Sequence, residues 1–313
     1  MPTPTFNHVS LVDRGACPLC GSHDYTMHIP FTAIPVVRCA SCAFIFSARL
    51  MPDEELNQYY QYGFGSERHR CGQIINAKIN CWAIQHLMRG VNFTNFLDVG
   101  AGYGFLLHEL QDRLGVSATG VELSEQEACY GSEHLNVDLR NCSLLDSGLE
   151  PLSFDVVACF EVLEHIPSPR DFIDELLRYL RPGGRLLIMT DNFECEVVTA
   201  LGPGFPKWIP HSHISHFGPE SIERLLKDKG MTVERSISYT PWELLVRSIY
   251  YKIRNIQTTP EDAFDLSSTL GSEMCGSYRF YLLRRVVNVL WAKLTARKGL
   301  KGALMYVLAK RDD

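Results

Sequence analysis

The chain has 313 residues, of which 46 % are hydrophobic, and a formal net charge of -6. Such a length can bury one large core and a small accessory module, so we expect one α/β domain with an appendage. The negative charge disfavours a nucleic acid as the main partner. The sequence has no run of about 18 uninterrupted apolar residues, so we expect no transmembrane segment in it. The first residues lack the basic and apolar regions of a signal peptide, so we expect a cytoplasmic protein.

Two CxxC pairs open the chain, formed by Cys17, Cys20, Cys39 and Cys42. Their spacing suits a hairpin whose four thiolates bind one tetrahedral zinc ion. Four thiolates leave no open coordination position, so this zinc is expected to stabilise the fold and not to take part in chemistry. We predict a zinc-ribbon module over residues 1–50; unpaired core cysteines are the alternative.

Residues 51–90 are predicted to connect this module to the main domain. The first part is polar and rich in tyrosine, which is typical either of a lid or of a surface helix that docks the ribbon. From residue 72 to 89, apolar side chains recur at helical intervals and predict a helix that leads into the first strand.

A glycine-rich turn follows the apolar run at residues 96–99. Gly100, Gly102 and Gly104 permit a sharp bend and leave room for a ligand against the backbone. A nicotinamide-binding turn would need G-x-G-x-x-G, but here the third glycine comes one residue early. Asp98 stands just before the turn, where its carboxylate would repel a phosphate and attract an ammonium group. These features favour S-adenosylmethionine (SAM) as the cofactor.

The second strand is predicted at residues 118–121 and ends at Glu122. A carboxylate at this tip can accept hydrogen bonds from both hydroxyls of a ribose. The alternative role is a charge at the N-terminus of the next helix, but Ser124 is better placed to cap that helix. We therefore predict that Glu122 binds the ribose.

Three motifs resemble those of the class I SAM-dependent methyltransferases. The string DVGAGYG resembles motif I of that family, and FDVV with EVLEHI at residues 154–166 resembles the signature of the methyltransferases related to the ubiquinone and menaquinone enzymes. The RPGG sequence before a strand matches the family's LKPGG element. The resemblance covers roughly residues 90–313 and implies a seven-stranded Rossmann-like sheet in a domain at 91–313, with a helical insertion at about 242–301 before a final antiparallel strand. The expected strands are 96–99, 118–121, 137–140, 154–159, 185–190, 232–239 and 303–310.

The resemblance also implies a set of cofactor-binding residues. The expected set is Asp98, Gly100, Ala101, Gly102, Gly104, Glu122, Leu123, Cys142, Ser143 and Phe160. A loop residue after the third strand is expected to contact the adenine, but the usual glycine-aspartate pair is missing there. Cys142, Ser143 and Asp146 remain candidates for that contact.

A loop rich in proline and glycine, residues 202–217, carries His211, His213 and His216. Histidine suits proton abstraction from the methyl acceptor because its usual pKa lies near neutral pH. We predict His216 as the catalytic base, with His211 second and Glu161, at the tip of the fourth strand, as the replacement if neither acts. A second metal site built from the histidines, or histidines that only bond the backbone, are the open alternatives.

The insertion before the last strand contains a helix with an apolar stripe and a basic remainder. The stripe consists of Phe280, Leu283, Val287, Leu290, Trp291 and Leu294, and the basic residues are Arg279, Arg284, Arg285, Lys293, Arg297 and Lys298. This pattern is typical of a cap helix with a solvated basic face; it is also compatible with a site for an anionic substrate or a membrane surface.

Taken with the resemblance, these features predict transfer of a methyl group from SAM to an oxygen or carbon of a small molecule. The zinc-binding leader resembles the region ahead of sugar and natural-product methyltransferases, so a sugar, glycoconjugate or secondary-metabolite precursor is the expected acceptor. The alternative is an RNA (rRNA base) methyltransferase with a zinc-binding leader, in which we would expect a histidine in the second knuckle and a more basic ribbon. A SAM-binding scaffold without activity is a third class.

Overall fold

The computed structural model describes residues 10–62, 67–260 and 281–311. Its centre is an eight-stranded sheet with the order β13-β12-β14-β10-β9-β6-β7-β8. In chain order the strands are β6 (Asn95–Val99), β7 (Ser117–Glu122), β8 (Asp138–Asn141), β9 (Phe154–Phe160), β10 (Leu180–Asp191), β12 (Met231–Tyr239), β13 (Arg297–Lys298) and β14 (Leu304–Arg311).

The sheet confirms the Rossmann-like α/β fold and all seven expected strands. Strands β6 to β10 are mutually parallel, and β14 is antiparallel to both β10 and β12. One short strand, β13, was not expected; it lies at the sheet edge and pairs with the end of β12. The carboxyl ends of the parallel strands meet at one edge of the sheet, which is where such sheets bind ligands.

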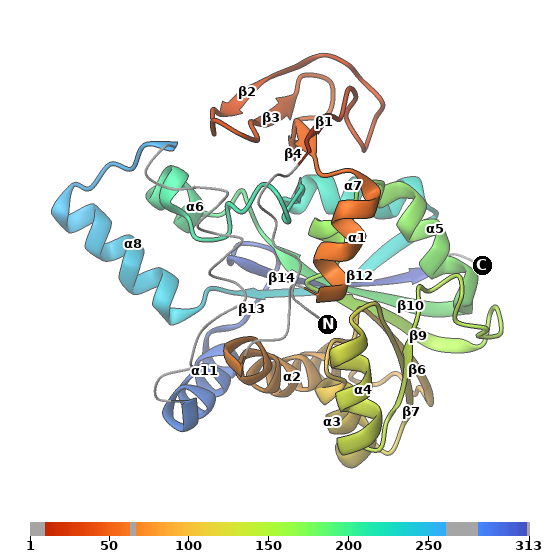
Figure 1. Ribbon diagram of the computed structural model, residues 1–313. Helices are drawn as coiled ribbons and strands as arrows, with labels where there is room; N and C mark the ends of the chain where they lie inside the picture. Colours follow the sequence, from red (N-terminus) through yellow and green to blue (C-terminus); the bar gives the residue numbers. More distant parts are fainter. Residues whose placement is uncertain (1–9, 63–66, 261–280, 312–313) are drawn as a thin grey trace.

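Helices cover both faces of the sheet (Figure 1). On one face α5 (Pro169–Tyr179) and α7 (Pro219–Asp228) pack into a core that also contains Cys17 and Cys39, one cysteine from each CxxC pair. On the other face α2 (Glu67–Leu87), α3 (Phe105–Leu114), α4 (Glu125–His134) and α11 (Tyr281–Thr295) share a second core. Each helix places an apolar side toward the sheet, so one core is buried on each face of the sheet.

The N-terminal module is a small sheet of β2 (Tyr25–Ile29), β3 (Val36–Cys39) and β4 (Ile45–Ser47). Its fourth strand, β11 (Ser215–His216), comes from the loop after β10, so the module and that loop form one sheet. Beside it, β1 (Val12–Asp13) pairs with β5 (Arg49–Leu50). The ribbon therefore docks on the main domain through backbone hydrogen bonds.

The tyrosine-rich stretch forms α1 (Asp53–Tyr62). Tyr59 is buried with its ring against His211, and the Tyr60 hydroxyl lies 3.2 Å from His165 Nδ1. These contacts favour the docking helix over the lid for the part of this stretch that the structure describes. Among the described residues, no helix has the length and apolar character needed to cross a membrane.

Among the described residues, the expected helical insertion contains α8 (Trp242–Arg254) and α11. Another helix, α6 (Glu196–Leu201), lies earlier in the chain, after β10. The predicted apolar stripe on α11 does not form a buried face, because Leu283, Leu290 and Leu294 are exposed while Ala292 is buried. Phe280 and Arg279 lie outside the described residues.

Candidate active site

The glycine turn between β6 and α3 is closed by the side chain of Glu122. The Gly102 amide donates to Glu122 Oε2 at 2.8 Å, and the Ser124 amide donates to Oε1 at 2.9 Å. Ser124 caps α4 by accepting from the Glu127 amide at 3.4 Å, as predicted. Glu122 therefore stands at the tip of β7 beside the turn, and each of its oxygens retains a second lone pair for a ligand hydroxyl.

Three acids gather around this turn: Asp98, Glu122 and Glu127. Among the described ion pairs, His69 Nε2 lies 3.1 Å from Glu127 Oε1, and no Lys or Arg pairs with any of the three. Burial and the neighbouring Glu122 raise the pKa of Asp98 to about 8, and burial and Glu127 raise the pKa of Glu122 to about 7. Asp98 Oδ1 is buried and has no hydrogen-bond partner in the described chain. A buried carboxylate without a partner is costly, so this site fits a cationic ligand such as the aminoacyl sulfonium of SAM.

Gln73 of α2 also belongs to this site and was missed from the sequence. The Tyr103 amide donates to Gln73 Oε1 at 2.9 Å, and a Cβ at Gly102 would lie only 2.3 Å from the same oxygen. Gly102 has φ +55°, a conformation that other residues rarely adopt, and an added Cβ would in addition displace the Gln73 side chain from the turn. Gln73 carries no motif, and only the packing of α2 against α3 brings it to the turn.

The remaining residues of the predicted cofactor set lie at the same sheet edge. Leu123 is 37 % exposed after β7, and its carbonyl and that of Glu122 accept from the Asn141 side-chain amide. Cys142 and Ser143 follow β8 and are half-buried, with Ser143 Oγ donating to Asp146 at 2.5 Å. Ala101 is buried in the turn, and Phe160 is half-buried at the end of β9.

A pocket of about 200 Å³ opens beside the tips of β9 and β10. Its polar wall contains Glu161, Asp191 and Lys207, and its apolar wall contains Tyr239, Trp242 and Trp291. Lys207 Nζ lies 3.0 Å from Glu161 Oε1 and 3.6 Å from Asp191 Oδ2. The pocket thus joins two carboxylates and one ammonium group to an aromatic surface.

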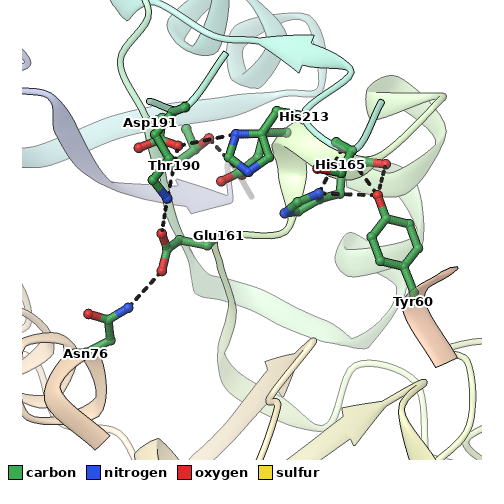
Figure 2. Close-up of polar contacts among 10 residues, drawn as sticks. Tyr60, Asn76, Glu161, His165, Thr190, Asp191 and His213 are labelled. Atoms are coloured by element: carbon green, nitrogen blue, oxygen red, sulfur yellow. Dashed lines mark hydrogen bonds and ion pairs between the residues drawn. The ribbon is translucent and has the colours of Figure 1, made fainter. Parts of the chain in front are cut away.

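Glu161 is held at the strand tip with φ +54°, an uncommon backbone conformation for a residue with a side chain. Asn76 of α2 donates to its second oxygen at 2.9 Å, as Figure 2 shows. The Lys207 charge keeps the pKa of Glu161 below its usual value despite burial. Glu161 is therefore an ionised group with a fixed direction at the pocket wall.

Asp191 differs from Glu161 in its environment. Burial raises the pKa of Asp191 to about 6, although the Lys207 charge opposes this shift. Its Oδ2 atom has no hydrogen-bond partner in the described chain and lies 3.6 Å from His213 Nδ1 (Figure 2). Burial and the neighbouring His165 lower the pKa of His213 well below its usual value, so that ring is neutral at pH 7. Asp191 Oδ2 thus lies 3.6 Å from both Lys207 Nζ and His213 Nδ1, and the pKa of Asp191 is close to neutral pH.

The structure does not bring His216 or His211 to the pocket wall. His216 is 1 % exposed in β11, where its ring packs 4.5 Å from Phe193 and 4.8 Å from Trp208 between ring centroids. His211 is fully buried against Tyr59. The loop turns these side chains inward because β11 pairs with β4 of the ribbon, so the geometry does not support either histidine as the base.

His213 takes part in a different grouping. Ligand atoms of Glu164, His165 and His213 lie within 4.8 Å of one another, and these are groups that bind divalent metals. Glu164 accepts from Thr190 Oγ1 at 2.9 Å, and His165 Nδ1 lies 2.9 Å from the Ser212 carbonyl oxygen (Figure 2). Of the three loop histidines, only His213 joins such a group among the described residues.

The four predicted zinc ligands converge in the ribbon. The Sγ atoms of Cys17, Cys20, Cys39 and Cys42 lie within 4.8 Å of one another, with 3.5 Å between Cys17 and Cys42 and between Cys20 and Cys39. A tetrahedral ion with Zn–S bonds of about 2.3 Å needs sulfurs about 3.8 Å apart. The cluster therefore has the composition and size of a structural zinc site.

Comparisons with known proteins agree with this geometry. A family model described as a methyltransferase domain matches residues 56–236. The ubiquinone biosynthesis O-methyltransferase of Xanthomonas euvesicatoria is 34 % identical over 161 residues, and that of Xylella fastidiosa is 32 % identical. These matches cover 47 % of this chain and 66 % and 65 % of the relatives, so the chain spans just under two thirds of their length.

Among solved structures, a SAM-dependent methyltransferase of Thermotoga maritima is 14 % identical with a TM-score of 0.48, covering 76 % of this chain and 89 % of that one. The family model alone covers more than half of the chain. The chain belongs to the methyltransferase domain family and has the class I SAM-dependent methyltransferase fold.

Proposed function

We propose that this protein transfers the methyl group of SAM to an oxygen or carbon atom of a small-molecule acceptor. One observation carries the proposal: the buried, unpartnered Asp98 carboxylate stands beside the glycine turn, on the same sheet edge as the pocket at Glu161 and Asp191. A cation-binding cofactor site next to a pocket of mixed charge is what methyl transfer from a sulfonium requires.

In this proposal, Asp98 binds the amino group of the cofactor and Glu122 binds the ribose hydroxyls. Both roles use charge-assisted hydrogen bonds, which are stronger than neutral ones. Bound SAM supplies an electrophilic methyl group, and the chain positions the acceptor against it. Gly100, Gly102 and Gly104 pack closely against Val162, Gln73 and Val137, and with Ala101 they form the tight turn that would face the cofactor. Leu123, Cys142, Ser143 and Phe160 would contact the adenosine from the neighbouring strand ends.

We further propose Asp191 as the group that takes the proton from the acceptor. A base works best when its pKa lies near the working pH, and the pKa of Asp191, about 6, is closer to that range than the lowered pKa of Glu161. Glu161 and Lys207 would orient the acceptor through their paired charges. This assignment replaces His216 and His211 and keeps Glu161 in the pocket.

The expected acceptor is a ring compound such as a sugar, glycoconjugate or secondary-metabolite precursor. Tyr239, Trp242 and Trp291 offer flat apolar surfaces, and the carboxylates offer acceptors for ring hydroxyls. The names of the curated relatives, which are O-methyltransferases of ubiquinone biosynthesis, favour an oxygen acceptor on a small molecule. We also propose the division into a ribbon at 1–50, a connection at 51–90 and the catalytic domain at 91–313.

The test combines binding with transfer. Titration calorimetry should detect SAM binding by the full chain, and the same protein with radiolabelled SAM should label material in a small-molecule extract and not in cell RNA. An Asp98→Ala variant should weaken both signals, whereas Asp112→Ala, which removes an exposed acid of α3, should keep them. Label transferred to RNA alone would contradict the small-molecule acceptor, and absence of SAM binding would contradict the whole proposal.

A further inference from the structure

Helices α8 and α11 expose an unusual amount of apolar side chain. On α8 the exposed apolar residues are Val246, Ile249, Tyr250 and Ile253, and Ile253 is 75 % exposed. Their spacing of three and four residues places them along one side of the helix. A surface helix of a soluble domain normally turns such a stripe inward, so this side of α8 is built for contact with something else.

The second helix has the same property. On α11 the exposed apolar residues are Leu282, Leu283, Val286, Leu290 and Leu294, three of which are more than 60 % exposed. Leu282, Val286, Leu290 and Leu294 recur every four residues, so they form a second stripe. The opposite side of α11 is already used, because Ala292 is buried and Trp291 donates to the Thr240 carbonyl at 2.9 Å.

Basic residues accompany both stripes. The segments 242–254 and 281–301 contain nine Lys and Arg residues and one acid, Glu243, although the whole chain has a net charge of -6. Lys252, Arg254 and Lys293 are exposed on the helices, and Arg297, Lys298 and Lys301 are exposed just beyond α11. Positive charge is thus concentrated on the part of the molecule that also exposes its apolar side chains.

The two helices meet at the pocket. Trp242, at the start of α8, donates from Nε1 to Asn288 Oδ1 of α11 at 2.8 Å, and both residues line the pocket together with Trp291. Both helices lie on the same side of the molecule, at the sheet end that carries β13 (Figure 1). We call the exposed sides of α8 and α11 the α8–α11 surface; the pocket lies where the two helices meet.

We propose that the α8–α11 surface docks on a bilayer containing anionic phospholipids. Apolar stripes flanked by Lys and Arg are the features that hold an amphipathic helix at a lipid interface, with leucine and isoleucine among the acyl chains and the cations at the headgroups. A second copy of this chain fits less well, because it would bring two strongly positive surfaces together. A nucleic acid would use the cations but leave the leucines in water.

The docked orientation would present the pocket to the lipid surface. An acceptor dissolved in the bilayer could then reach Glu161 and Asp191 without passing through water, a consequence that rests on the proposed methyl transfer. The docking itself does not depend on that activity, so membrane binding and methyl transfer can be tested separately.

The experiment is vesicle co-sedimentation of the full chain without SAM. The protein should pellet with phosphatidylcholine vesicles that contain about a third phosphatidylglycerol, and not with phosphatidylcholine alone. A charge variant, Lys252→Glu with Arg254→Glu and Lys293→Glu, and an apolar variant, Ile253→Gln with Leu282→Gln and Leu294→Gln, should each weaken binding at least about tenfold. The matched control reverses two exposed basic residues on α5 and α7, Arg178→Glu with Lys227→Glu, and should bind like the parent.

Hydrogen exchange on the unmodified protein provides a second measurement in case a variant fails to fold. Anionic vesicles should slow exchange in α8 and α11 and leave α5 and α7 unchanged. The proposal is overturned if the parent does not bind anionic vesicles, if the control variant loses binding as strongly as the charge variant, or if the apolar variant converts a dimer into a monomer. Binding to RNA without binding to vesicles would overturn it as well.

Discussion

The ribbon gathers four cysteines, and the cofactor turn gathers three acids. In the ribbon, the sulfurs of four cysteines lie within 4.8 Å of one another. At the cofactor turn, burial and the Glu122 charge raise the pKa of Asp98, and burial and the Glu127 charge raise the pKa of Glu122. Four thiolates bind one cation, and of the three acids Glu127 is paired with His69 at 3.1 Å, so Asp98 and Glu122 remain for a cationic ligand. The ribbon cluster is complete, because four ligands close a tetrahedral site, whereas the carboxylate cluster is open on the ligand side.

In the pocket, two acids share one lysine. Glu161 and Asp191 also lie close together, but Lys207 stands between them at 3.0 Å and 3.6 Å. One ammonium group offsets one of the two carboxylates, so the cluster keeps a single negative charge and can accept a proton. Acids without a Lys partner therefore indicate a site for a cationic ligand here, whereas acids that share a Lys indicate a site for proton transfer.

Removing the ribbon's cation should have the largest effect. A structural zinc ion contributes roughly 10–16 kcal/mol of binding free energy in zinc-finger peptides, so a chelator should unfold β2 to β4. Because β11 pairs with β4, the loop that carries Lys207 and His213 should loosen with the ribbon. Hydrogen exchange can follow both segments.

The control for this experiment is Cys129→Ser, which replaces an exposed cysteine outside the ribbon and should change neither segment. Cys17→Ser should reproduce the effect of the chelator. Pure protein that contains no zinc and still protects the ribbon from exchange would contradict a structural zinc ion at the four cysteines.

Removing the proposed base should be next in size. Asp191→Asn should lower kcat by about 10²–10⁴ while SAM affinity is retained, because only proton transfer is lost. The measurement is the rate of methyl transfer with saturating SAM, and Glu223→Gln, an exposed residue of α7, is the control. Near-native turnover of the Asp191 variant would mean that Glu161 removes the proton, or that the acceptor is already ionised in solution and needs no base.

Removing one acid from the open cluster should weaken cofactor binding. Charge-assisted hydrogen bonds contribute roughly 1.5–3 kcal/mol, so Asp98→Ala or Glu122→Ala should lower SAM affinity about ten- to a hundredfold. Calorimetry with both variants and with Asp112→Ala as control would test this. Unchanged affinity in both variants would mean that the acids do not bind the cofactor.

The smallest effect should be that of pH on SAM affinity. Asp98 and Glu122 have raised pKa values of about 8 and about 7, so both are partly protonated below those values and attract a cation less. Affinity should therefore rise between about pH 6 and about pH 8, with a slope of at most about tenfold per pH unit for each proton released. Calorimetry across this range should give a flatter profile for Asp98→Asn, and a fall in affinity with rising pH would contradict the sign.

Much of this site could be predicted from the sequence because its signals are local. The glycine turn, Asp98 and Glu122 lie within one strand-turn-helix-strand unit, and its two strands lie within one residue of the expected ranges 96–99 and 118–121. The four cysteines were equally readable, since the spacing of each pair is set by one tight turn.

The pocket could not be predicted in this way. Gln73 reaches Tyr103, and Lys207 reaches Glu161, only because separate helices and loops pack together in the fold. His216 illustrates the opposite error: its chemistry suited a base, but pairing of β11 with β4 turned it into the core.

The sequence by itself determined the fold class, the cofactor turn and the cysteine cluster, because periodicity, glycine spacing and ligand type act over a few neighbouring residues. The tertiary structure alone decided which charges face each other. Asp191 obtains its raised pKa from burial, and its partner Lys207 comes from a loop that the ribbon holds in place. Such properties depend on distances between segments far apart in the chain, which no local pattern encodes.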